Sequence, residues 1–153
     1  MPSPSRAFAV AITSLCLLGT SPPSDGMVRT FNVPLTGAAE GDLAHPVASL
    51  GDPDGAGTLK LSINLERKQV CYDFSLSGLD TPMMAHIHRG PPHHVGPSVV
   101  TLFTGMGSDE LTKCIPWTNT RLAEIVAQPS NFYVNVYTTE FPDGALRGQL
   151  PAA

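Results

Sequence analysis

The chain has 153 residues, of which 42% are hydrophobic and 14% are charged, and its formal net charge is −4. This length suits a single domain. The 14 glycines and 15 prolines exclude a helical bundle, because both residue types disfavour helix interiors, and they follow no repeat that would suggest collagen. The sequence has no run of basic residues, so we expect no nucleic-acid partner. These features favour a turn-rich all-β domain.

The N-terminal segment has the composition of a secretory signal peptide. Arg6 precedes an apolar run over residues 7–18, and small residues follow as far as Ser21. The run is shorter than the roughly 20 residues of a membrane-spanning helix, so we expect no transmembrane segment; a buried N-terminal helix is the alternative. The expected organisation is a signal peptide over residues 1–21, a linker over residues 22–29 and one domain over residues 30–151. The mature protein is then secreted or periplasmic.

Two cysteines remain once such a leader is removed. Cleavage near Ser21 removes Cys16 and leaves Cys71 and Cys114. In an oxidising compartment an even pair of cysteines favours a disulfide. Closing a loop of this length stabilises a fold by about 4 kcal/mol in the chain-entropy description. The alternatives are two free thiols or a cysteine that binds a metal.

Apolar and polar residues alternate in several short segments, as is typical of half-buried strands. The clearest pair covers residues 59–65 and 70–76, where a polar turn separates two alternating runs and predicts a hairpin. Five more strands are expected, over residues 30–35, 84–88, 98–103, 132–137 and 145–150. One helix is expected near residues 119–128, with Asn119 as its cap and Pro129 ending it. This pattern predicts an all-β fold, an immunoglobulin-like or Greek-key β-sandwich with one short helix, and a closed barrel is the alternative.

Histidines are concentrated in one segment of the chain. His86 and His88 flank Ile87, so in a strand both imidazoles point to one face, about 7 Å apart. His93 and His94 follow in a loop rich in glycine and proline that could fold back toward them. Two imidazoles on one face can share a copper or zinc ion. The alternative is that the histidines are ordinary hydrogen-bonding surface groups.

Polar residues near the C-terminus alternate with apolar ones on two further strands. Tyr133, Asn135 and Tyr137 share one face of their strand, and Arg147 and Gln149 share one face of the next. Neighbouring strands would combine them with the histidines into a polar face of His86, His88, Tyr133, Asn135, Tyr137, Arg147 and Gln149. The alternative is the solvated sheet face that any sandwich has. The segment Glu140 to Gly144 predicts a turn in which Gly144 takes a positive φ.

These segments also carry a family resemblance. The runs AHIHRGP, GPSVVTLF and PSNFYVNVYTTEFPDGALRGQL resemble the CHRD domain, the module named after chordin, and PLTGAAE and VCYDFSLSGL are similar to earlier parts of it. The resemblance covers Phe31 to Leu150 and implies a secreted all-β module. Cys114 falls where many such domains have a second cysteine. Tyr137 stands where the family commonly has a histidine. If that histidine completes a metal site, then Tyr137 as a phenolate, His93 or His94 would have to replace it here.

The sequence has none of the common catalytic motifs. It contains no nucleophile elbow, no phosphate-binding glycine loop and no HExxH motif, so we expect no catalytic residues. The favoured function is a non-catalytic binding module for a protein or matrix partner. The alternative is an extracytoplasmic protein that binds copper, the only cofactor suggested, with His86, His88 and Tyr137, His93 or His94. A metal-dependent redox enzyme is the third hypothesis.

Overall fold

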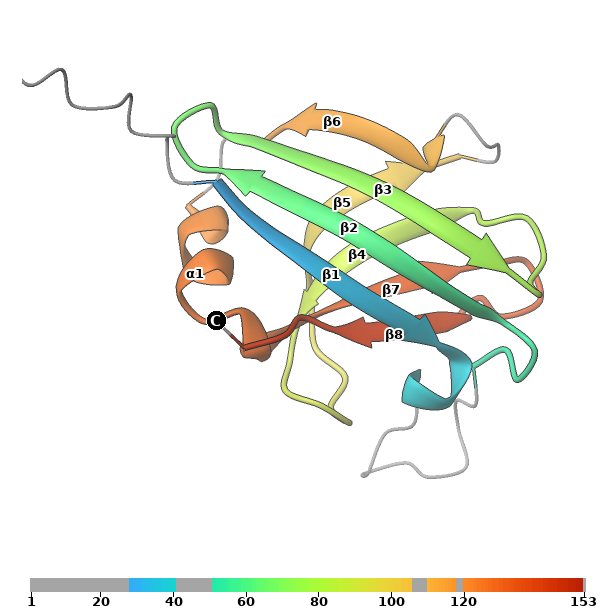
Figure 1. The fold of residues 1–153 in the computed structure, drawn as a ribbon. Helices are drawn as coiled ribbons and strands as arrows, with labels where there is room; N and C mark the ends of the chain where they lie inside the picture. The colour runs from blue at the N-terminus through green and yellow to red at the C-terminus, as the bar shows by residue number, and fades with distance from the viewer. Residues whose placement is uncertain (1–27, 41–50, 106–109, 118–119, 153) are drawn as a thin grey trace, which may run out of the picture.

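A computed structural model describes residues 28–40, 51–105, 110–117 and 120–152. In this part of the chain an eight-stranded sheet forms in which every paired strand is antiparallel (Figure 1). The strands are β1 (Val28–Thr36), β2 (Ala56–Asn64), β3 (Gln69–Ser77), β4 (Met84–Arg89), β5 (Ser98–Thr104), β6 (Thr112–Pro116), β7 (Phe132–Tyr137) and β8 (Leu146–Gln149). The helical segments given in full by the described residues are α1 (Arg121–Ala127) and the short 3-10 helices η1 (Gly37–Glu40) and η3 (Pro129–Asn131). The all-β prediction is confirmed.

The two layers of the domain are halves of one continuous sheet, in the order β5-β4-β7-β8-β1-β2-β3-β6. The sheet folds over so that β1, β2 and β3 lie in front of β4, β5 and β7 (Figure 1). It passes from one layer to the other where β8 pairs with β1, at Thr36 and Arg147. At the far edges no ladder joins β5 to β6 within the described ranges, but the Tyr72 hydroxyl on β3 donates to the Leu102 carbonyl on β5 at 3.0 Å. The result is a nearly closed structure.

The hydrophobic core lies between the two layers and follows the predicted alternation. On β1 the buried residues are Phe31, Val33 and Leu35, with exposed residues between them. The predicted hairpin of β2 and β3 is confirmed, and its register places Leu61 opposite Tyr72 in the core. Burying each large apolar side chain stabilises the fold by about 1.5–3 kcal/mol. These contacts therefore hold the two layers together.

The helix is close to its predicted position. Thr120 occupies its N-cap position, whereas the predicted cap, Asn119, lies outside the described residues. Leu122 and Ile125 are buried against the core, and Pro129 starts η3 where α1 has ended. In the described residues no helix is both long enough and apolar enough to cross a bilayer.

Strand β6 was not predicted from the sequence. Four of its five residues are exposed and only Ile115 is half-buried, so the strand has no apolar alternation to detect. It pairs with β3 so that Cys71 and Cys114 lie directly opposite each other. The predicted disulfide between them is confirmed, with an S–S distance of 2.03 Å. It fastens this edge strand to the sheet.

Most of the predicted signal peptide and linker lies outside the described residues. The predicted signal peptide, residues 1–21, lies outside the described residues, as does most of the predicted linker. The linker's last two residues, Val28 and Arg29, belong to β1 because they pair with Asn64 and Ile63 of β2. Strand β1 therefore includes two residues that the prediction assigned to the linker.

Candidate functional site

The residues of the predicted polar face come together on β4, β7 and β8. Pairing of β4 with β7 places His86 opposite Asn135 and His88 opposite Tyr133. Pairing of β7 with β8 places Arg147 opposite Asn135, on the other side. Alternation directs their apolar neighbours, such as Ile87 and Val134, into the core. The polar side chains thus occupy the opposite surface of these three strands.

This polar layer is buried, in contrast to a solvated sheet face. Tyr133 and Arg147 are each only 2% exposed. The loop of residues 90–97 folds back across the strands and is hydrogen-bonded to them. The Arg147 guanidinium donates to the Pro91 carbonyl at 3.0 Å, and the Gln149 amide donates to the Gly90 carbonyl at 3.0 Å. The Gly96 N–H donates to the Tyr133 hydroxyl at 3.1 Å. The loop and the layer therefore form one hydrogen-bonded unit.

Three of these side chains form a stack. The guanidinium carbon of Arg147 lies 3.5 Å from the centre of the Tyr133 ring. His88 stacks on the same ring, with centroids 5.0 Å apart and planes 15° from parallel. Arg147 comes from β8 and His88 from β4, the strands on either side of β7. Tyr133 is thus held between a cation and an imidazole, an arrangement that favours a fixed rotamer for all three.

The hydrogen bonds of His88 define its tautomer. Its Nδ1 lies 2.8 Å from the Gly96 carbonyl oxygen, which can only accept, so Nδ1 carries the proton. Its Nε2 lies 2.8 Å from the Tyr137 hydroxyl and accepts from it. Burial lowers the pKa of His88, and the nearby charges of His86 and Arg147 act in the same direction, although the bond to Gly96 opposes them. His88 is therefore a neutral imidazole with both nitrogens bonded.

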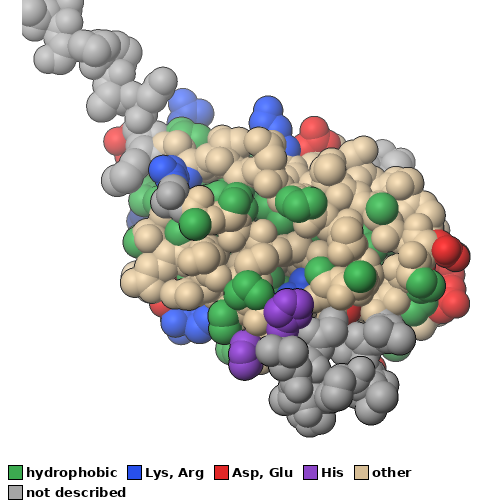
Figure 2. Space-filling model, turned by 60° about the horizontal axis from the view of Figure 1, so that its bottom comes forward, with side chains coloured by type: hydrophobic (Ala, Val, Ile, Leu, Met, Phe, Trp, Pro, Cys, Tyr) green, Lys and Arg blue, Asp and Glu red, His purple; other side chains and the backbone are tan. Residues whose placement is uncertain are grey.

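The other candidate metal ligands divide into two groups. The His86 ring lies 5.7 Å from the ring of His88 and 5.5 Å from that of Tyr137, between centroids. His86 is half-buried, and this burial lowers its pKa. His93 and His94 are exposed on the loop, and histidine side chains are visible at the surface on this side of the molecule (Figure 2). Among the described residues, no three of His, Cys, Asp and Glu come together as a metal-binding group. The structure thus brings His86, His88 and Tyr137 together without His93 or His94.

Sequence reasoning missed one member of the buried layer. Glu40, at the end of η1, is only 4% exposed. The Asn135 amide, in the orientation that its neighbours require, donates to both Glu40 carboxyl oxygens and to the Leu146 carbonyl at 2.9 Å. Burial raises the pKa of Glu40 to about 7, although the Arg147 charge and the Asn135 hydrogen bond lower it. No local pattern pointed to Glu40, because a buried cation needs an anionic partner and the burial of Arg147 became visible only in the structure.

Gly144 closes the predicted turn directly over this carboxyl group. Its φ of 140° confirms the positive φ expected from the sequence. A Cβ at this position would lie 2.7 Å from a Glu40 carboxyl oxygen and 2.8 Å from the Asn135 side-chain amide. Glycine is therefore required here both by the backbone conformation and by the close approach of the buried layer.

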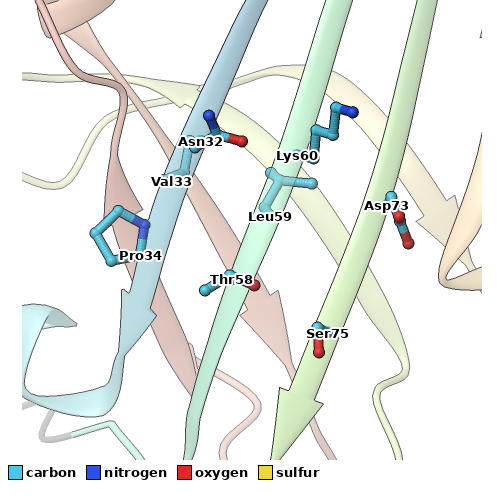
Figure 3. A pocket seen from close by; sticks show the side chains of 8 residues that line it. All are labelled: Asn32, Val33, Pro34, Thr58, Leu59, Lys60, Asp73 and Ser75. Atoms are coloured by element: carbon cyan, nitrogen blue, oxygen red, sulfur yellow. The ribbon is translucent and has the colours of Figure 1, made fainter.

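A second, open surface lies on the other layer, on the outward side of β1, β2, β3 and β6; we call it the outer face. It contains a hollow of 360 Å³ lined by Asn32, Val33, Pro34, Thr58, Leu59, Lys60, Asp73 and Ser75 (Figure 3). A hollow of 300 Å³ adjoins it, since Lys60 and Asp73 line both. The Thr112 hydroxyl donates to the Asp73 carboxylate at 2.8 Å. None of the polar residues that line the first hollow was predicted as a site residue, because exposed positions of a strand have no distinctive pattern.

The fold and the disulfide define a small, disulfide-stabilised all-β domain of extracellular type. Residues 31–150 match the family described as the CHRD domain, and the chain belongs to that family. The resemblance noted in the sequence is thereby confirmed. Comparison with curated proteins and with solved structures finds no match.

Proposed function

We propose that the chain is a secreted or periplasmic, non-catalytic binding module that recognises a protein or matrix partner through its outer face. Membership of the CHRD family and the Cys71–Cys114 disulfide support an extracytoplasmic location. The observation that carries the proposal is the pair of adjoining hollows on the outer face, which share Lys60 and Asp73.

The polar layer on β4, β7 and β8, on the other side of the domain from the outer face, is less suited to a partner. Its polar groups are turned toward one another and toward the loop of residues 90–97, as the bonds of His88, Arg147 and Gln149 show. Buried polar groups that already have partners gain little from hydrogen-bonding to a protein or matrix partner, because each new hydrogen bond would replace an existing one. The same internal pairing supports a structural role for these residues in place of catalysis.

The outer face has the properties of a rigid recognition surface. Lys60 and Asp73 lie opposite each other on β2 and β3, so a cation and an anion are presented side by side. The hydroxyl groups of Thr30 and Ser62 are hydrogen-bonded at 2.9 Å. A sheet surface needs little ordering when a ligand binds, and this lowers the entropic cost of association. The chemistry fits a polar partner that offers both a hydrogen-bond acceptor and a donor.

A charge reversal tests the assignment. We expect the Lys60→Glu/Asp73→Lys variant to lose at least about tenfold in affinity, equivalent to about 1.4 kcal/mol, because both charges would face like charges on the partner. The measurement is crosslinking of the purified protein to extracellular proteins and matrix of its own host, followed by titration of the captured component.

The matched control is Glu66→Lys/Arg67→Glu in the turn of the same hairpin, which also preserves net charge. Both residues are exposed and line neither hollow. Capture lost in the first variant and kept in the second supports the proposal. Equal capture by both variants, or no capture by the folded wild type, would refute the outer face as the recognition surface.

A further inference from the structure

We propose that His86, His88 and Tyr137 form a binding site for a single cupric ion, with Tyr137 as a phenolate ligand. Their three rings make a triangle whose sides, between centroids, are 5.7, 5.5 and 6.2 Å. They come from two neighbouring strands, since His86 and His88 are on β4 and Tyr137 is on β7. The site is therefore built on paired backbone and not on a loop.

The spacing of two ligand atoms suits copper. His88 Nε2 and Tyr137 Oη are 2.8 Å apart. Neighbouring ligands of a square-planar ion with bonds of about 2.0 Å are also about 2.8 Å apart, whereas a tetrahedral ion separates them by about 3.3 Å. Square-planar coordination by nitrogen and oxygen is characteristic of Cu²⁺. An ion bound to both atoms would lie to one side of the line that joins them, so the two rings would keep their spacing and turn to direct their lone pairs at it.

His88 already has the surroundings of a metal ligand. A histidine that binds a metal through one nitrogen typically donates the N–H of the other to a carbonyl or carboxylate. His88 donates from Nδ1 to the Gly96 carbonyl, which leaves the Nε2 lone pair directed at Tyr137. Stacking on Tyr133 holds the ring in that orientation.

His86 supplies the third ligand from the edge of the buried layer. Within the described residues its ring nitrogens make no hydrogen bond, so binding a metal costs it no existing partner. Its half-buried position gives the ion a route from solvent. His93 and His94 are exposed on the loop and are not needed.

Binding is an exchange of a metal ion for a proton. Burial raises the pKa of the Tyr137 hydroxyl, so its proton leaves only when the metal displaces it. The O–H bond of Tyr137 breaks, a Cu–O bond forms, and the proton passes to the buffer, with no change in the oxidation state of copper. Cu²⁺ should bind more tightly than Zn²⁺, since it leads the affinity order for such ligands and prefers this geometry.

The test is titration of the purified protein with Cu²⁺ and Zn²⁺ by calorimetry in buffers of different protonation enthalpy, together with visible absorption. We expect one Cu²⁺ per chain, release of one proton and a tyrosinate-to-copper charge-transfer band. Tyr137→Phe should abolish the band and the proton release. His86→Ala should weaken binding by about 100-fold or more, exceeding the loss typical of an outer-shell partner.

His86→Ala separates binding from folding, because no hydrogen bond in the described residues depends on that ring, and an unchanged unfolding midpoint verifies this. His93→Ala/His94→Ala is the matched control and should bind like the wild type. The proposal is overturned if the folded wild type binds no stoichiometric Cu²⁺, if binding survives His86→Ala unchanged, or if it is lost in the loop variant. It is also overturned if bound copper gives no charge-transfer band that depends on Tyr137.

Discussion

At the residue scale, the main feature of this domain is a group of buried polar side chains. They lie on the side of the sheet that faces away from the hydrophobic core. Glu40, Asn135 and Arg147 are each no more than 5% exposed. A carboxyl group buried to this extent strongly disfavours ionisation unless opposite charge and hydrogen bonds compensate. Here compensation is incomplete, and the pKa of Glu40 rises to about 7. Its protonation is therefore linked to stability.

The sign of this linkage follows from proton binding in the two states. Between pH 4.5, the ordinary pKa of the carboxyl group, and pH 7, the native state holds a proton that the unfolded chain has lost. The free energy of unfolding must then fall as pH rises through this range. At about 1.4 kcal/mol for each unit of pKa difference, the loss reaches about 3 kcal/mol.

Glu40→Gln should remove this dependence, because glutamine has a similar shape and does not ionise. We expect the variant to gain stability relative to the wild type by about 3 kcal/mol between pH 4.5 and pH 7.5. Urea unfolding at several pH values measures the difference, and taking the difference cancels the titration of all other groups. Parallel pH profiles for the two proteins would show that Glu40 ionises normally in the folded state.

At the element scale, some strands could be predicted from the sequence and one could not. Strands β1, β2 and β3 bury every second residue, so their alternation was visible. Strand β6 buries none of its residues fully, and its pairing with β3 depends on contacts distant in sequence. The loop of residues 90–97 was visible only as a run of glycine, proline and histidine. Its return across the sheet depends on Tyr133, Arg147 and Gln149, which no local pattern connects to it.

Because β6 has so little buried surface, the disulfide should be important for its attachment. We expect Cys71→Ser/Cys114→Ser to lower the free energy of unfolding by about 2–4 kcal/mol. Hydrogen exchange should accelerate most in β6. Denaturant unfolding and residue-resolved exchange measure both effects, with the amides of β7 as the internal reference. An unchanged unfolding midpoint, or equal acceleration in β6 and β7, would show that the ladder holds β6 without the disulfide.

At the scale of the whole molecule, the class of fold and the family were accessible from the sequence, whereas the environment of the site was not. Alternation correctly placed His86, His88 and Tyr137 on one face, because the strand period requires it. It could not show that the face is covered, that Tyr133 lies between Arg147 and His88, or that Glu40 joins them. Those features arise from pairings between distant segments. For the same reason the continuity of the sheet was not predictable.

The proposed export of the chain can be measured directly. Expressed in an exporting host, the protein should be recovered outside the cytoplasm without residues 1–21, and with a mass two hydrogens lower than that of the reduced chain. Intact-mass spectrometry determines both. Leu17→Arg, which places a charge in the apolar run, should keep the chain in the cytoplasm. Recovery of an exported protein that still carries residues 1–21, or normal export of the variant, would contradict the prediction.

The pairing of β8 with β1 also determines how the domain responds to tension. The two strands are antiparallel, and the start of β1 and the end of β8 lie at the same end of the molecule, beside α1 (Figure 1). Only Thr36 and Arg147 pair between these two strands, so a pull on the two ends of the domain would break this short junction and then peel β1 from β2 one residue pair at a time. The domain would therefore open from one end at modest force. The hairpin of β2 and β3 and its disulfide to β6 would remain outside the line of pull.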